Sequence, residues 1–154
     1  MQYDLAIQKV VLRLESATSE QYISIDSDKL TAFQVGQTYF EYVTSDTMLA
    51  PGIFEIAFKG PNSSHLIQRT KTRIVKTTDQ IRILYRPYDY HYVKNQYGTF
   101  KVDNKKSFLE AYNNDPQVKD VIKISKLSFG KSRLDNDISQ ALEILGSKET
   151  VSLK

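Results

Sequence analysis

The chain has 154 residues, of which 40% are hydrophobic and 25% charged, with a formal net charge of +3. This length and composition fit one globular domain over residues 1–154. The chain has no cysteine, which excludes disulfides and thiolate metal sites, and no apolar run is long enough for a membrane span or typical of a signal peptide. We therefore expect a protein of the cytoplasm, or one assembled inside the cell into a larger particle, without membrane contact.

The charge is distributed unevenly along the chain. Residues 1–60 carry four basic and eight acidic groups, a net charge of −4. Residues 61–106 carry ten basic and three acidic groups, a net charge of +7, and residues 107–154 carry seven of each. The middle third is thus a basic block, which favours an anionic partner.

The first expected element is a helix near the start of the chain. Tyr3, Ile7, Val10 and Leu14 are separated by four, three and four positions. This spacing places them on one face of a helix with 3.6 residues per turn. No glycine or proline interrupts the stretch.

From about residue 21 to residue 102 the sequence predicts strands. Short runs rich in Ile, Val, Thr, Tyr and Phe alternate with turn residues such as Gly36, Pro51–Gly52 and Gly60–Pro61. Because the connections are too short for parallel crossovers, we expect a largely antiparallel sheet of about six to eight strands. Pro87 predicts an edge or a bend in this sheet.

The last third of the chain predicts helices. One ends at Asn113–Asn114, and Asp115 with Pro116 fits the N-cap and first position of another. Residues 122–129 fit either a strand or a continued helix. A final helix begins near Leu134 and is expected to end at Gly146. The expected fold is α+β, with an N-terminal helix, a central sheet and C-terminal helices packed on one face of that sheet. The sequence does not determine which of the two faces the helices cover.

Residues 68–86 predict a basic hairpin. With a two-residue loop at residues 77–78, residue 76 pairs with residue 79, and the basic residues fall on one face. Arg73 then lies opposite Arg82, and Arg69 lies opposite Arg86, with Lys71 between them. A shift of the register by one residue would place isoleucines on this basic face. The register with the two-residue loop is therefore favoured, because it keeps the apolar and basic residues on separate faces. Like charges opposite one another repel, so such a face favours an anionic ligand.

The tyrosines extend this basic surface. Half of the ten tyrosines lie in residues 85–100, and Tyr88, Tyr90 and Tyr92 alternate as residues on one face of a strand do. Bases stack on aromatic rings with about 1–3 kcal/mol each while cations follow the phosphate backbone. The candidate residues for binding nucleic acid are Arg69, Lys71, Arg73, Arg82, Arg86, Tyr88, Tyr90, Tyr92, Lys94 and Tyr97.

A simpler interpretation needs no ligand. Tyrosines at strand spacing commonly cover a half-buried sheet face with their hydroxyl groups in water. Glu41 or Glu55, both on expected strands, would turn the basic patch into ordinary ion pairs if either lay beside the arginines.

No motif for catalysis, a metal or a cofactor is found. His65 and His91 are the only histidines, and their separation does not match a metal site. There is no Gly-x-Ser-x-Gly elbow, and the Gly-Lys-Ser at residues 130–132 lacks the upstream glycine of a phosphate loop. We therefore expect a non-catalytic protein without a cofactor.

Three hypotheses follow. The first is a protein that binds nucleic acid, single-stranded DNA or RNA, through the basic hairpin and the tyrosine segment. The alternative is a structural or assembly subunit, as in a phage particle or mobile-element machine, whose acidic and basic regions dock between copies of a homo-oligomer or onto a protein partner. A third, an inhibitor of a nucleic-acid enzyme, requires an acidic surface that only residues 1–60 offer.

Overall fold

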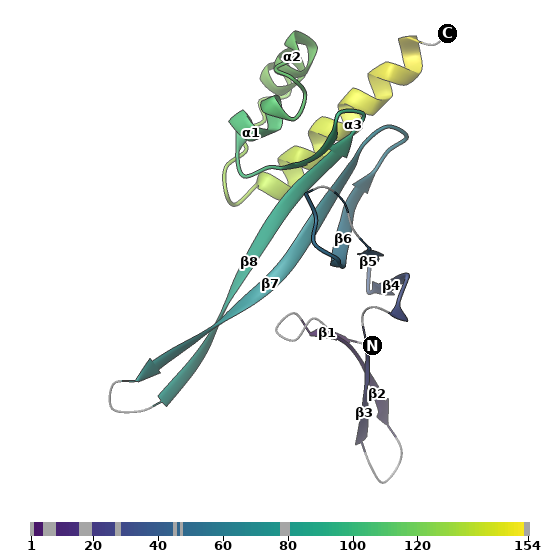
Figure 1. The fold of residues 1–154 in the computed structure, drawn as a ribbon. Coiled ribbons are helices and arrows are strands. Elements are labelled where there is room, and N and C mark those ends of the chain that lie inside the picture. The colour runs from purple at the N-terminus through teal and green to yellow at the C-terminus, as the bar shows by residue number, and fades with distance from the viewer. Residues whose placement is uncertain are drawn as a thin grey trace.

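A computed structural model describes residues 2–4, 9–15, 20–26, 29–44, 46, 48–77 and 81–152. These residues form two antiparallel sheets followed by three helices (Figure 1). The strands are β1 Gln2–Asp4, β2 Lys9–Glu15, β3 Glu20–Ile25, β4 Ala32–Val35, β5 Thr38–Val43, β6 Gly52–Lys59, β7 Ser64–Thr77, β8 Ile81–Asn95 and β9 Gly98–Lys101. The helices are α1 Lys105–Glu110, α2 Pro116–Ile124 and α3 Leu134–Ser152.

The predicted N-terminal helix is wrong. Residues 2–4 and 9–15 are strands of a three-stranded sheet in the order β1–β2–β3, and Ile7 lies outside the described residues. The four-residue spacing of Val10 and Leu14 fits a helix, but as an even number it fits a strand equally well. Leu12 between them completes the alternation of a strand, and the helical pattern was coincidental.

This small sheet packs on the larger one through an aromatic cluster. The ring centroid of Tyr3 lies 5.5 Å from that of Phe33 and 5.3 Å from that of Phe40, and the two phenylalanines stack at 4.9 Å. Val10, opposite Tyr3 in the register, is buried. Burial of Tyr3 in this cluster raises its pKa to about 12.

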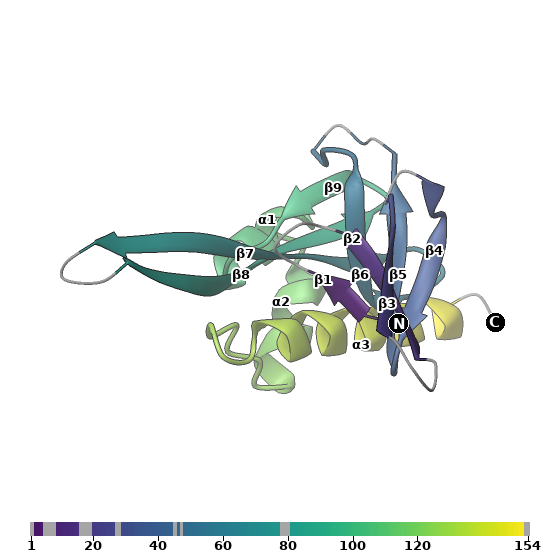
Figure 2. The same cartoon turned by 90° about the horizontal axis from the view of Figure 1, so that it is seen from below.

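The second sheet confirms the predicted antiparallel arrangement. Its six strands run in the order β4–β5–β6–β7–β8–β9, so each strand pairs with its neighbours in the sequence. β7 and β8 have 14 and 15 residues and extend well beyond the other strands (Figures 1 and 2). Pro87 lies within β8, at a position where β8 pairs with β7 alone, so its other edge is open as the proline predicted.

The C-terminal helices largely follow the local signals in the sequence. The Asp115 side chain accepts a hydrogen bond from the backbone N–H of Gln117 at 2.7 Å, and Pro116 begins α2, as predicted. Asn113 and Asn114 adopt φ values of 53° and 59°, a left-handed conformation that asparagine tolerates. α2 ends at Ile124, so the ambiguous residues 122–129 are a helix end followed by an irregular connection.

The predicted end of the last helix is wrong. α3 continues past Gly146 to Ser152, and Gly146 does not adopt the left-handed conformation of a helix-ending glycine. No helix among the described residues combines the length and hydrophobicity that a bilayer crossing requires.

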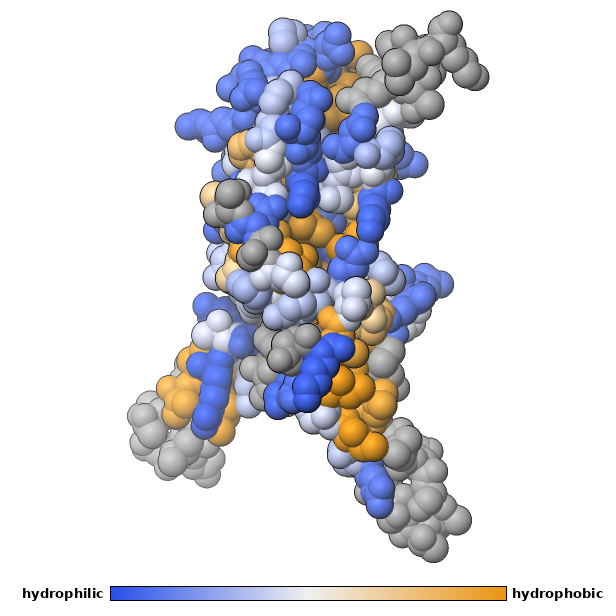
Figure 3. All heavy atoms as spheres, turned by 45° about the vertical axis from the view of Figure 1, so that its right-hand side comes forward, coloured by the Kyte–Doolittle hydropathy of each residue, from blue (hydrophilic) through white to orange (hydrophobic). Residues whose placement is uncertain are grey.

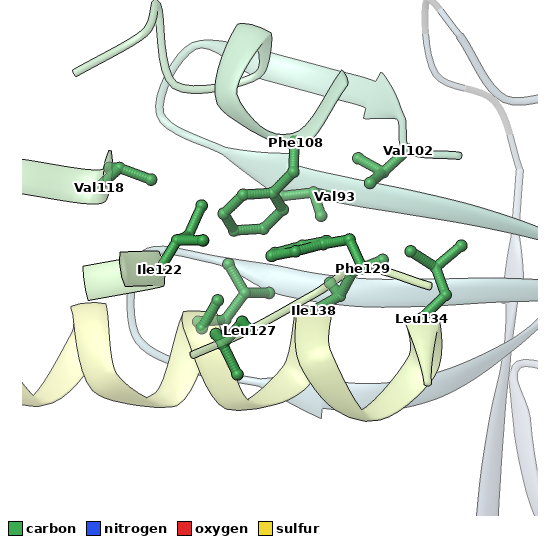
Figure 4. Close-up of a cluster of buried hydrophobic side chains, with 11 residues drawn as sticks. Val93, Val102, Phe108, Val118, Ile122, Leu127, Phe129, Leu134 and Ile138 are labelled. Carbon is green, nitrogen blue, oxygen red and sulfur yellow. The ribbon is translucent and has the colours of Figure 1, made fainter. Parts of the chain in front are cut away.

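The main core lies between the helices and one face of the large sheet. Val93 from β8, Phe108 from α1, Ile122 from α2 and Ile138 from α3 are each at most 1% exposed and belong to one buried cluster (Figure 4). Each such side chain stabilises the fold by roughly 1.5–3 kcal/mol on burial. Because successive residues of a strand alternate between faces, Tyr92 next to Val93 belongs to the opposite face of the sheet.

Candidate functional site

The longest feature of the molecule is a two-stranded ribbon that leaves the body of the sheet. β6 pairs with β7 only as far as Ile67, and β9 pairs with β8 only from Tyr92 onward. Among the described residues, the stretch beyond these points pairs only within the ribbon. We call residues 71–77 and 81–87 the arm, and residues 64–70 and 88–94 its root. The arm reaches away from the helices (Figures 1 and 2).

The predicted register of this hairpin is wrong. Arg73 lies opposite Tyr85 rather than Arg82, and Arg69 lies opposite Asp89 rather than Arg86. Lys71 and Arg73 share a face with Arg69 as predicted, but Arg86 pairs with Thr72 and so belongs to the other face. The five cations therefore do not form one surface.

The physical reason lies in the connection between the strands. β7 ends at Thr77 and β8 begins at Ile81, so three residues rather than two join them. Two-residue hairpin loops need positive φ angles, which the β-branched pair Thr77–Thr78 disfavours. The arm is also exposed on both sides, so no buried face forces the separation of apolar and basic residues that the prediction assumed.

Hydrophobic side chains are exposed on both faces of the arm. On one face Val75 lies opposite Ile83, with exposures of 52% and 46%, beside the exposed Tyr85. On the other face Leu84, 45% exposed, lies opposite Ile74. Figure 3 shows that hydrophobic side chains gather on the arm and on the hairpin of β2 and β3, which lie at the same end of the molecule. The arm therefore exposes to solvent the kind of hydrophobic side chains that strands usually bury.

The cations differ in their surroundings. Lys71, Arg73 and Arg86 are exposed, and in the part of the chain that the structure describes no carboxylate lies within 4 Å of their charged groups. Lys76 and Arg82 pair in the register near the tip, where their side chains are outside the described part. By sequence the arm, counted through its loop as residues 71–87, has five basic residues and one acidic residue.

Arg69 is neutralised at the root. Its guanidinium donates two hydrogen bonds to Glu55, one of them at 3.0 Å, and another to Asp89 at 2.8 Å, while Asp135 of α3 lies at 3.4 Å. The hydrogen bonds to Glu55 raise the pKa of Arg69 above its ordinary value. The simpler interpretation of the basic patch is thus confirmed for Arg69 with Glu55, whereas Glu41 pairs with Lys59 at 2.7 Å.

The tyrosines divide between surface and core. Tyr88, 52% exposed, and the half-buried Tyr90 lie with ring centroids 4.8 Å apart, and the ammonium of Lys101 lies 4.9 Å above the Tyr90 ring. Tyr92 instead packs edge-on against Phe54 at 5.9 Å in a second, smaller buried cluster. Only part of the predicted stacking row is therefore accessible.

The two remaining candidates lie at the far end of β8. The Lys94 ammonium pairs with Asp46 at 3.3 Å, so it is not a free cation. Tyr97 is 48% exposed in the turn between β8 and β9, where its backbone N–H donates to the Asn95 side chain. Lys94 is the last residue of the root and Tyr97 lies beyond it, so both are away from the arm.

A buried histidine pair at the root was missed by the sequence analysis. His65 Nε2 lies 3.2 Å from His91 Nδ1, His65 Nδ1 lies 2.9 Å from the Ser139 hydroxyl, and His91 Nε2 lies 3.3 Å from Asp135. This chain of contacts joins β7, β8 and α3. The correct register would have indicated this contact. It pairs His65 with Val93 and Ile67 with His91, so the two histidines are diagonal neighbours on one face of the ribbon.

Burial keeps both histidines neutral. It lowers the pKa of His65 to about 3, with the neighbouring His91 and Arg69 acting in the same direction. Burial also lowers the pKa of His91, although Asp135 and Asp89 oppose that shift. The pair therefore acts at neutral pH as a hydrogen-bonded connection between the helix and the ribbon root. In the described part of the chain, no three His, Cys, Asp or Glu side chains are grouped so as to hold a metal ion.

Comparison with known proteins gives no relative. No protein-family model, curated protein or solved structure matches the chain.

Proposed function

We propose that the protein is a structural subunit that assembles with other copies of itself, and that the arm is the element that makes the contact. The observation that carries this proposal is the exposure of Val75, Ile83 and Leu84 on both faces of one ribbon. Contiguous exposed hydrophobic surface marks protein contact sites, and a two-stranded ribbon gains stability when a further layer covers it.

Charge supports a second copy as the partner. The arm with its loop has a net charge of +4, from five basic residues and one acidic residue. Residues 1–60 have a net charge of −4, of which −2 is left after the ion pairs of Asp46 with Lys94 and of Glu55 with Arg69. Opposite charges on two regions of one chain attract different regions of two copies and suppress contacts between like regions. The apolar centre and charged surroundings match the anatomy of protein interfaces.

A concentration series by mass photometry and light scattering tests this function. We expect oligomers that grow with concentration, and we expect the double substitution of Ile83→Ser with Leu84→Ser to shift assembly to about tenfold higher concentration or more, as loss of an interface hot spot does. The matched control is Ile124→Ser, because Ile124 on α2 is 75% exposed but lies outside the arm. A protein that stays monomeric at all concentrations would contradict the proposal.

Nucleic-acid binding is the second candidate, and one observation favours it. Arg86, Tyr88 and Tyr90 belong to the same face of β8, and Lys101 lies over Tyr90. Two accessible rings beside two cations suit a short single-stranded segment. The neutralised Arg69 and the aliphatic side chains of the arm make this candidate the weaker one, because neither contributes to phosphate binding or base stacking.

Fluorescence anisotropy with labelled single-stranded oligonucleotides at two salt concentrations tests the second candidate. Binding through phosphates weakens steeply with salt, and Tyr88→Ala should weaken it further. The control is Tyr22→Ala, because Tyr22 is also strongly exposed but lies on β3. Absence of binding at low salt would exclude this function.

A further inference from the structure

We infer that the arm of one copy docks on the β2–β3 hairpin of a second copy. This inference rests on the proposed function and adds the acceptor surface to it. It is carried by the exposed hydrophobic residues of that hairpin, by the charges at the ends of both hairpins, and by the direction in which both project.

The β2–β3 hairpin has one apolar face. The register pairs Val10 with Ile25 and Leu12 with Ile23, so these four side chains belong to the same face as Tyr3, the partner of Val10. Near the body this face is covered, because Tyr3 packs against Phe33 and Phe40, and Val10 is 1% exposed.

Farther from the body the same face is uncovered. Ile23 is 46% exposed, a value that matches the 46% of Ile83 on the arm. The apolar face therefore continues beyond the aromatic cluster that covers its base. β3 is also an edge of its sheet, and among the described residues it pairs only with β2. An open strand edge beside an apolar face suits an added ribbon.

By sequence and register, the outer parts of the two hairpins have charges of opposite sign. In the β2–β3 hairpin the last pair of the register is Glu15 with Glu20, two acidic residues at opposed positions. In the arm the last pair of the register is Thr77 with Ile81, and the pair before it is Lys76 with Arg82, two basic residues at opposed positions. By sequence, one hairpin end is therefore acidic and the other is basic, and opposite charges favour contact between these two ends.

Both hairpins project from the end of the molecule opposite the helices (Figures 1 and 3). A neighbouring copy in the same orientation, displaced sideways, brings its β2–β3 hairpin beside the first copy's arm. The contact joins two different surfaces, so a pair of copies keeps one free arm on one copy and one free acceptor on the other. Such a heterologous interface builds a ring when the rotation closes and an open filament when it does not.

Mixing two defective variants tests the inference with the full chain. The arm variant carries Ile83→Ser with Leu84→Ser, and the acceptor variant carries Ile23→Ser. We expect each variant alone to require about tenfold higher concentration or more for assembly. An equimolar mixture should form dimers that do not grow, because one intact arm meets one intact acceptor. Melting temperatures of both variants at low concentration verify that each folds.

The outcomes separate the two proposals. If the arm variant fails to assemble but Ile23→Ser assembles as the wild type does, the acceptor is elsewhere and the inference is overturned while the proposed function stands. If the mixture gives no dimer, the intact arm of one variant does not dock on the intact hairpin of the other, which also overturns the acceptor. If the wild type never assembles, both proposals fail together.

Charge reversal provides a second, independent measurement. Glu15→Lys with Glu20→Lys should prevent assembly, and Lys76→Glu with Arg82→Glu should do the same. Combining both reversals in one chain should restore assembly, because the attraction between the hairpin ends returns. A chain with all four substitutions that stays monomeric would overturn the pairing of these ends.

Discussion

The arm and its root belong to the same two strands, and yet their surroundings differ completely. Ile67 at the root and Ile83 in the arm share one face of the ribbon, but Ile67 is 0% exposed and Ile83 is 46% exposed. Arg69 at the root contacts three carboxylates, whereas Arg73 farther along the same strand has none within 4 Å among the described residues.

The residues of the root therefore anchor the ribbon in the fold, whereas the residues of the arm are exposed to solvent. The root supplies the packing and the ion pairs that fix β7 and β8 against β6 and α3. The arm keeps its strands through the continuous ladder of β7 with β8, and its side chains contribute little to the fold. Stability and assembly should therefore respond to different substitutions in the same ribbon.

The largest expected difference concerns two isoleucines. Ile67→Ala should lower the free energy of unfolding by about 3–4 kcal/mol, because it leaves a cavity in a closed core. Ile83→Ala, the same substitution on the same face of the arm, should lower it by less than about 0.5 kcal/mol. Urea denaturation followed by circular dichroism, at a concentration below that of assembly, measures both. Equal losses would show that the arm is part of the folded core.

A smaller difference is expected for two arginines of β7. Arg69→Ala should lower the free energy of unfolding by about 2–3 kcal/mol, because it leaves Glu55 and Asp89 close together without a cation. Arg73→Ala should change it by less than about 0.5 kcal/mol, because Arg73 is a surface residue. The same denaturation experiment applies, and a larger effect at Arg73 would reverse the assignment of root and arm.

The smallest of the three effects depends on pH. The folded-state pKa of His65 is about 3 and its ordinary value is 6.5, so the unfolded chain binds the proton more tightly. Stability from His65 is therefore present above about pH 6.5 and is lost as the pH falls, by about 2 kcal/mol between pH 7 and pH 5. The lowered pKa of His91 adds to the loss in the same direction.

Denaturation of the wild type and of His65→Asn at both pH values measures this effect. The asparagine does not titrate, so the loss of stability between pH 7 and pH 5 should shrink in the variant. An unchanged loss would assign the pH dependence to other groups. Assembly through the arm should be affected less, since His65 and His91 lie at the root.

Local patterns in the sequence predicted the strands and the later helices well. The run rich in Ile and Phe at residues 53–58 and the Asp115–Pro116 pair each act within a few residues, so they can be recognised without knowledge of the fold. The prediction of an N-terminal helix was wrong because the four-residue spacing of Val10 and Leu14 fits the period of a strand as well as that of a helix. The predicted end of α3 was wrong because a helix can continue through a glycine such as Gly146, at a cost of about 1 kcal/mol relative to alanine.

The candidate site depended on contacts that no local pattern contains. Grouping Arg69 with Arg73 was correct because alternation within one strand is local, but grouping them with Arg86 required the loop length. Because both faces of the arm are exposed, burial gave no constraint on the register. His65 and His91 meet only through that register, so no local pattern in the sequence indicates that they are neighbours.

The midpoint of the ribbon pairs Lys71 with Pro87. Proline cannot donate a backbone hydrogen bond, and a lysine on an edge strand repels further copies of that strand. Unspecific stacking of arms into fibrils is therefore interrupted halfway along each ribbon. At high protein concentration, we expect Lys71 and Pro87 to limit aggregation at the position where the exposed hydrophobic arm begins.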